Sequence, residues 1–173
     1  MATYKLDTAH SDILFKVKHL MITTVTGQFK TFDATFTSDA EDFSDARIQF
    51  TAAVDSIETR NEQRDAHLKS DDFFNAEKFP ELTFVSTSFE KNEEGYQLKG
   101  HLTIRDITKP ITLNVDYMGT VVDPWGQTKT GFEAEGKIKR KEFGLNWDAV
   151  TEAGGIVVSD EIKLQLNVQF IKQ

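Results

Sequence analysis

The 173-residue chain has no cysteine, which excludes disulfides, thiol catalysis and thiolate metal sites. It also lacks a surplus of basic residues. Its net charge of -8 argues against nucleic acid or an anionic membrane as the main partner, because both need a basic surface. Residues 1–7 have neither the basic nor the apolar region of a secretory leader. We therefore expect a single cytoplasmic domain with no integral membrane association; a processed exported protein is the alternative.

Recognisable catalytic and metal-binding motifs are missing as well. The chain has four histidines, His10, His19, His67 and His101. None forms a His-x-His or His-x-x-x-His pair, so convergent zinc ligands are not predicted. Ser70, His67 and Asp72 are close in the sequence, but closeness within one turn does not create the geometry of a catalytic triad. We expect no catalytic residue, no metal and no cofactor.

The sequence does contain alternating apolar and polar residues over most of its length. Residues 162–170 are the clearest case, and similar segments lie at 12–21, 25–37, 46–54, 82–89, 98–104, 111–117 and 132–138. A period of two over such lengths predicts half-buried strands. A break in phase between Phe29 and Phe32 indicates a bulge or a sharp bend. Turn signals at 92–95 and 123–126 join neighbouring segments.

About eight such strands can bury their apolar faces as a sandwich or as a closed antiparallel barrel. The hairpin-like succession favours an up-and-down barrel. A barrel of ~8 strands has an interior just wide enough for side chains or one small ligand. The sequence therefore predicts an all-β fold with one helix inserted mid-chain.

The predicted helix lies within residues 56–74. Thr59 and Glu62 have the spacing of a capping box, which predicts a helix from Arg60. Asp65 and Lys69 are an i,i+4 ion pair on it. A second short turn begins at Ser70. Since this helix has almost no apolar face, we expect it to lie across the strands as a lid.

The strand positions expected to face inward carry few charges or amides. Such a lining suits an alkyl or isoprenoid chain and not a sugar or nucleotide. The predicted lining residues are Phe15, Val17, Phe50, Phe84, Leu102, Ile104, Leu113, Phe132, Leu164 and Val168, with Phe143 and Trp147 guarding the entrance. Small inward residues, Ala52, Gly100, Ala134 and Gly136, are expected to leave room for a ligand. The alternative is that the inward faces pack on one another as a dry core.

A local basic cluster on the lid gives two interpretations. Arg60, Arg64 and His67 adjoin one another by helical spacing, and His19 ends an inward series at the expected mouth of the barrel. These residues could hold a polar or phosphorylated head group, since arginine matches phosphate bidentately. Alternatively, Arg64 and His67 pair with Asp65, Asp71 or Asp72 and fix the lid in place.

The same region carries a family resemblance. Its pattern is Ser56-Ile57-x-Thr59-x-Asn61-x-x-Arg64-Asp65-x-His67-Leu68-x-Ser70-x-Asp72-Phe73-Phe74, followed by Phe79-Pro80. Other segments that agree are His10-Ser11, Phe15-x-Val17-x-His19, Gly27-x-Phe29-x-x-Phe32, Gly100-x-Leu102-Thr103-Ile104, Thr108-Lys109-Pro110 and Arg140-x-x-Phe143-Gly144-Leu145. In this order, they resemble the YceI-like, polyisoprenoid-binding family.

The resemblance implies a lipocalin-like barrel that holds a long apolar lipid, such as an isoprenoid or a quinone-like molecule. It favours a carrier that binds, transports or sequesters this lipid. The alternatives are an enzyme that uses Arg64, His67 and Asp72 on a lipid-like substrate, and a structural or stress-response barrel with a filled core. Leu14 and Met118, expected to be exposed, suggest a homodimer.

Overall fold

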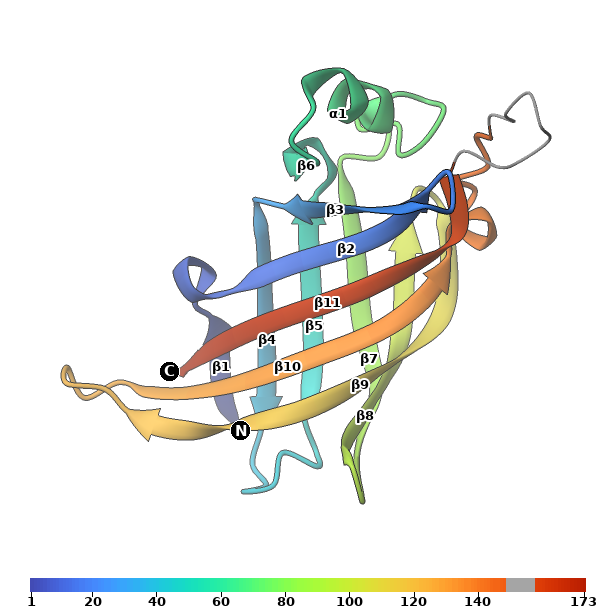
Figure 1. The fold of residues 1–173 in the computed structure, drawn as a ribbon. Coiled ribbons are helices and arrows are strands. Elements are labelled where there is room, and N and C mark those ends of the chain that lie inside the picture. The colour runs from blue at the N-terminus through green and yellow to red at the C-terminus, as the bar shows by residue number, and fades with distance from the viewer. Residues whose placement is uncertain (149–157) are drawn as a thin grey trace.

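The computed structural model describes residues 1–148 and 158–173 and is mostly β-structure (Figure 1). Its strands are β1 (Ala2–Leu6), β2 (Asp12–His19), β3 (Thr23–Phe29), β4 (Phe32–Ser38), β5 (Arg47–Ala53), β6 (Ile57–Glu58), β7 (Glu81–Asn92), β8 (Gly95–Ile104), β9 (Ile107–Val122), β10 (Thr128–Lys139) and β11 (Val158–Lys172). The helical elements are α1 (Glu62–Lys69) and the 3-10 turns η1 (Thr8–His10), η2 (Val54–Ser56) and η3 (Arg140–Phe143).

These strands form a closed antiparallel barrel that is eight-stranded in effect. Three of its eight strands are interrupted, and each is made of two segments: β1 with β2, β3 with β4, and β5 with β6. The pairing of β2 with β3 continues as the pairing of β1 with β4, and that of β3 with β6 continues that of β4 with β5. Strand β11 pairs with β10 on one side and with both β2 and β1 on the other, which closes the ring. The predicted up-and-down barrel is confirmed, and the break in phase at 29–32 is the gap between β3 and β4.

The helix begins two residues later than the sequence predicts. Asn61 is its N-cap, and the Asn61 side chain accepts a hydrogen bond from the Arg64 N–H at 2.9 Å. Arg60 has a φ of 65°, which is left-handed and cannot belong to a right-handed helix. The Thr59 hydroxyl and N–H both donate to Asp65 instead. The predicted capping box is therefore wrong, because Asp65 takes the hydroxyl that would have capped the helix.

Two further local predictions concern the helix and its end, and the ion pair is wrong. Lys69 Nζ lies 3.6 Å from Asp55 Oδ1, which is on η2. Asp65 accepts a hydrogen bond from the Thr59 hydroxyl instead, so the predicted Asp65–Lys69 pair is not formed. Ser70 ends α1, and the predicted short turn does begin there, because the Phe73 and Asn75 N–H groups donate to the Ser70 carbonyl. The Ser70 hydroxyl does not cap this turn, because it donates to the His67 carbonyl.

Helix α1 has no buried residue and lies at one end of the barrel beside β6 (Figure 1). The turns between β4 and β5 and between β7 and β8 lie at the opposite end. A lid position was predicted from the missing apolar face, and α1 occupies such a position. No helix within 1–148 or 158–173 combines the length and the apolar character needed to span a bilayer.

Candidate functional site

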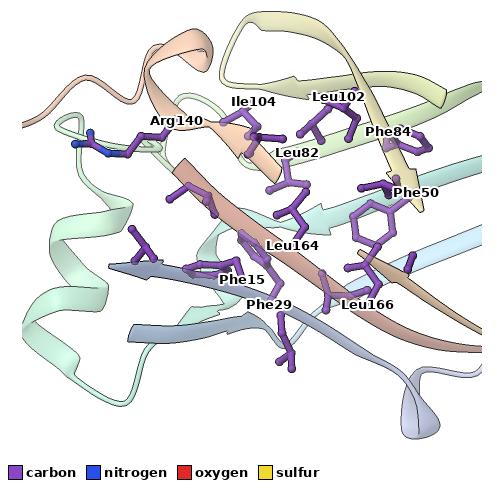
Figure 2. A pocket seen from close by; sticks show the side chains of 18 of the residues that line it. Phe15, Phe29, Phe50, Leu82, Phe84, Leu102, Ile104, Arg140, Leu164 and Leu166 are labelled. Atoms are coloured by element: carbon purple, nitrogen blue, oxygen red, sulfur yellow. The ribbon is translucent and has the colours of Figure 1, made fainter. Parts of the chain in front are cut away.

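A cavity of about 410 Å³ lies inside the barrel, within the usual range for small-molecule sites. Figure 2 shows apolar side chains from several strands pointing into one space, with Arg140 at its edge. All the lining residues predicted from the sequence border this cavity except Phe143. Phe143 lies on η3 and is only 1% exposed, so it packs into the wall and does not guard an entrance. The inward faces therefore do not meet as a dry core.

Phenylalanine dominates the lining. All but three of the 14 phenylalanines border the cavity; the exceptions are Phe32, Phe79 and Phe143. Away from α1, the rings of Phe36, Phe43 and Phe132 pack edge to face with centroids 5.6–6.2 Å apart. Such contacts add to the stability gained from burial. This cluster lies toward the end of the barrel opposite the helix, because Phe43 belongs to the turn between β4 and β5.

The glycines of the wall keep the cavity open in a way that the sequence did not reveal. A Cβ on Gly27 would lie 2.2 Å from the Phe15 ring, and one on Gly100 would lie 2.4 Å from the Phe84 ring. The space above Gly100 is thus filled by Phe84, and not left empty for a ligand as predicted. Because each ring lies flat on a glycine of a neighbouring strand, it follows the wall and does not project into the centre.

Gly136 and Ala52 also differ from the prediction that small inward residues leave ligand space. A Cβ on Gly136 would meet Leu113 at 2.5 Å, so Leu113 occupies that space. Ala52 is 1% exposed and does not border the cavity, whereas Ala134 does. Of the four small residues, only Ala134 contributes open lining.

The polar side chains of the lining gather at the α1 end. They are Lys18, His19, Thr59, Arg64, His67 and Arg140. No carboxylate of residues 1–148 and 158–173 borders the cavity, although the chain carries a net charge of -8. Arg60 was predicted to belong to this group, but it lies outside the lining. Its left-handed backbone precedes the helix, so it does not share the helical spacing of Arg64 and His67. The cavity therefore has an apolar body and one basic end.

Arg64 and His67 are oriented by different partners. Arg64 donates from Nε to the Thr59 hydroxyl at 2.7 Å and from Nη2 to the Thr59 carbonyl, so it does not pair with an aspartate. Its Nη1 has no hydrogen-bond partner among the described residues. His67 Nε2 lies 2.8 Å from the Asp72 carboxylate, one of the pairs predicted as a structural alternative. Within residues 1–148 and 158–173, Arg64 thus has donors at the mouth that no acceptor uses.

Trp147 closes part of the same end. Its ring meets the His67 ring at 4.7 Å in an edge-on arrangement and lies 5.5 Å from the Phe73 ring. Trp147 and the lid are therefore in contact, and both border the cavity. This contact links the helix to the segment that follows β10.

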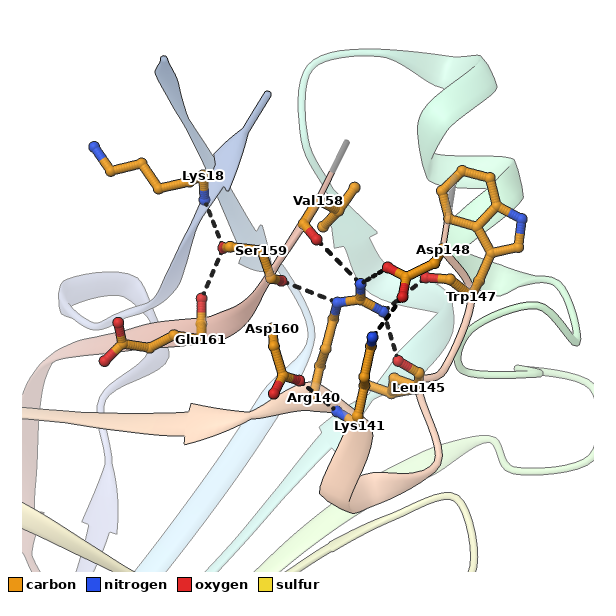
Figure 3. A network of polar contacts seen from close by, with 10 residues as sticks. All are labelled: Lys18, Arg140, Lys141, Leu145, Trp147, Asp148, Val158, Ser159, Asp160 and Glu161. Carbon is orange, nitrogen blue, oxygen red and sulfur yellow. Dashed lines mark hydrogen bonds and ion pairs between the residues drawn. The ribbon is translucent and has the colours of Figure 1, made fainter. Parts of the chain in front are cut away.

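Arg140 holds that segment in place and is the main residue that sequence reasoning missed (Figure 3). Arg140 is 2% exposed, and all five of its N–H groups donate hydrogen bonds. The acceptors are the carbonyls of Leu145, Trp147, Val158 and Ser159 and the Asp148 carboxylate, at 2.7–3.1 Å. Arg140 therefore joins the residues before 149–157 to the start of β11.

A signal for Arg140 was present in the alternation of β10. Phe132, Ala134 and Ile138 border the cavity, and Arg140 continues this inward series. Its carboxylate partner Asp148 also bonds Lys141. The hydrogen bonds from Lys141 and then Arg140 lower the pKa of Asp148 below its ordinary value of 3.8. An arginine at an inward position next to a loop was the clue.

The acid–base candidates do not assemble into a triad. The Ser70 hydroxyl donates to the His67 carbonyl and not to its ring, while the ring bonds Asp72. Within the described parts of the chain, no three histidine or acidic side chains converge as metal ligands would.

Leu14 and Met118, the two apolar residues that suggested a homodimer, differ in their exposure. Met118 is 60% exposed, whereas Leu14 is only half-exposed because Gln28 and Gln165 flank it on the neighbouring strands. Leu14 also borders the cavity. A homodimer stays a prediction.

Comparisons with known proteins agree with the fold. The model of the YceI-like domain matches residues 4–170. Protein YceI of Salmonella newport is 40% identical over 174 residues, which cover 99% of this chain and 88% of that protein.

Two solved structures share the barrel. BcnA of Burkholderia cenocepacia has a TM-score of 0.82 at 23% identity, with 95% of this chain and 98% of that chain covered. A polyisoprenoid binding domain from Saccharophagus degradans, implicated in plant cell wall breakdown, has a TM-score of 0.69 at 14% identity, with 98% of each chain covered. These two show the fold alone, and the family match spans nearly the whole sequence: the chain belongs to the YceI-like family.

Proposed function

We propose that this protein binds a long apolar lipid of the isoprenoid class inside its barrel and carries or sequesters it. The observation that supports this most is the cavity of about 410 Å³, whose body is apolar and whose polar lining lies at one end. The polyisoprenoid binding domain from Saccharophagus degradans shares the fold. Each buried CH₂ contributes about 0.8 kcal/mol, so a five-carbon unit contributes roughly 4 kcal/mol before entropy costs.

The orientation of the lipid follows from where the polar groups lie. The tail would extend toward the Phe36–Phe43–Phe132 cluster, and the polar end would lie near Arg64 and His67. A charged or polar head group needs hydrogen-bond donors at this end. Arg64 Nη1 has no acceptor among the described residues, so it can donate to such a head group. A phosphorylated head or the carbonyls of a quinone-like ring would suit this end.

The direct test is native mass spectrometry of the purified chain, followed by organic extraction. A bound lipid in about one-to-one ratio supports the carrier. Turnover of that lipid on incubation would favour an enzyme instead. A barrel that takes up no prenyl alcohol of any length would overturn the proposal.

The role of Arg64 in holding the head group has its own test. Arg64→Ala should weaken binding of a prenyl phosphate by roughly tenfold to a hundredfold, since hydrogen bonds to charged groups contribute about 1.5–3 kcal/mol. Binding of the matching prenyl alcohol should change much less. Arg60→Ala is the matched control, because Arg60 lies outside the lining. If Arg64→Ala lowers only thermal stability and leaves phosphate binding unchanged, Arg64 serves the lid alone.

The cellular parts of the hypothesis stay predictions. A cytoplasmic location is tested by fractionation, and a role in transport or stress response by the lipid content and survival of cells that lack the protein.

A further inference from the structure

The turn between β2 and β3 exposes large apolar side chains on a backbone that does not favour them. Leu20, Met21 and Ile22 are 38%, 63% and 79% exposed. The Ile22 N–H donates to the His19 carbonyl, and Leu20 and Met21 have φ of 52° and 60°. Two consecutive left-handed residues form a type I′ turn, where Asn-Gly is preferred. Exposed Leu-Met at this place indicates that the side chains serve a contact outside the barrel.

This turn adjoins the basic end of the cavity. Lys18 and His19, the two residues before it, border the cavity, and so does Val158, which pairs with His19. Met21 and Ile22 are therefore two and three residues from the cavity lining. Whatever contacts this turn lies beside the mouth.

A row of lysines runs across the outer face next to the turn. Lys16 on β2 lies directly opposite Lys163 on β11, which lies opposite Lys137 on β10. Among the described residues, only Lys137 of these three has a carboxylate within ion-pair distance, Glu161 at 3.4 Å. Like charges placed directly opposite destabilise a sheet. The row is thus a local basic face that the overall charge of -8 conceals.

A second exposed apolar group lacks this combination. Met118, Val121, Val122 and Trp125 on the hairpin between β9 and β10 are 60–82% exposed. Figure 1 places this hairpin far from α1 and from the turn between β2 and β3. The hairpin tip carries Asp123 and no row of lysines. It therefore offers apolar contact without proximity to the mouth.

We propose that the Leu20–Ile22 turn and the Lys16–Lys163–Lys137 row form a surface that docks on an anionic phospholipid bilayer. The apolar turn would enter the head-group region while the lysines meet lipid phosphates. Docking in this orientation brings the basic end of the cavity to the bilayer. Docking does not depend on the cargo, but its use in lipid exchange rests on the proposed function.

Flotation of the full chain with vesicles tests the surface directly. The protein should bind phosphatidylglycerol–phosphatidylcholine vesicles more strongly than pure phosphatidylcholine, and high salt should release it. Leu20→Asn with Met21→Gly installs the residues that a type I′ turn prefers, so the fold should be kept. This double variant should weaken binding by about tenfold or more. Lys16→Gln with Lys163→Gln should weaken it roughly thirtyfold, at ~1 kcal/mol per lysine.

Val121→Thr with Val122→Thr is the matched control for exposed apolar residues and should bind as the parent does. No binding of the parent to anionic vesicles at low salt would overturn the proposal. It would also be overturned if the Leu20/Met21 variant bound normally, or if only the Val121/Val122 variant lost binding. Lipid extraction on the same samples reports the cargo separately, so a failure of docking is distinguishable from a failure of the carrier function.

Discussion

Gly27→Ala should reduce the capacity of the cavity without unfolding the barrel. The new Cβ would lie 2.2–2.7 Å from three atoms of the Phe15 ring, whereas carbon atoms pack best at about 3.5–4.0 Å. The ring must therefore move by more than an ångström. Since these atoms are the far end of a side chain and the cavity is open beside them, the ring can swing into the centre. We expect the free energy of unfolding to fall by about 1–3 kcal/mol.

The loss should appear in ligand length. A phenyl ring that projects into the cavity displaces about as many carbons as one isoprene unit. The longest ligands should then lose up to ~4 kcal/mol of burial, or several hundredfold in affinity. Shorter ligands should lose little. Affinities for a series of prenyl alcohols, measured by quenching of tryptophan fluorescence, report this shift, because Trp147 borders the cavity.

Gly131→Ala is the matched control, because the nearest atom to its Cβ would be 3.7 Å away in ordinary contact. If a folded Gly27→Ala protein binds the whole series as the parent does, the reasoning about rings held against glycines is refuted.

Three further predictions concern stability. Arg140→Lys should cost about 3 kcal/mol, since lysine has three donors for five acceptors; an unchanged urea midpoint would contradict this. Because the pKa of Asp148 is lowered by Lys141 and then Arg140, its stabilising effect is present at neutral pH and is lost as pH falls below about 3.8. Asp148→Asn should make the melting temperature depend less on pH in the acid range. Identical pH profiles for the variant and the parent would contradict this. Asn61→Ala should cost about 1 kcal/mol as a lost N-cap, whereas Glu62→Ala should cost little; the reverse order in denaturant melts would restore the capping box.

The strands and their closure could be predicted because alternation directly reports which side chains share a face. Segments such as 162–170 kept this period throughout, and their inward residues border the cavity. The break at 29–32 was predicted from the same signal. Counting eight such segments with short connections left few arrangements other than a barrel.

The start of the helix and the role of Arg140 could not be predicted in the same way. The Thr59–Glu62 spacing was present, but the Thr59 hydroxyl is taken by Asp65, and Arg60 adopts a left-handed backbone. Which acceptor wins depends on the fold around it. Arg140 is bonded mostly to backbone carbonyls, and backbone partners leave no mark in the sequence.

The space inside the barrel depends on pairs of residues from neighbouring strands. Phe15 faces Gly27 across the β2–β3 pairing, so a large and a small residue together form a flat wall. Taken alone, the glycine would suggest open space inside the barrel, and the phenylalanine would suggest that its ring fills that space. Registers between strands were needed to see that they compensate each other.

The seam between β1 and β11 has a consequence for how the chain matures. Tyr4 pairs with Lys172, and the Gln173 N–H donates to the Thr3 carbonyl, so the ring is completed by segments about 170 residues apart. On the ribosome, every other strand is synthesised before that last partner emerges. Until then, the phenylalanine-rich interior is open to water on a sheet with two free edges, which favours aggregation. Chaperone demand during synthesis should therefore be high for this barrel, even though the finished molecule leaves no such edge at the seam.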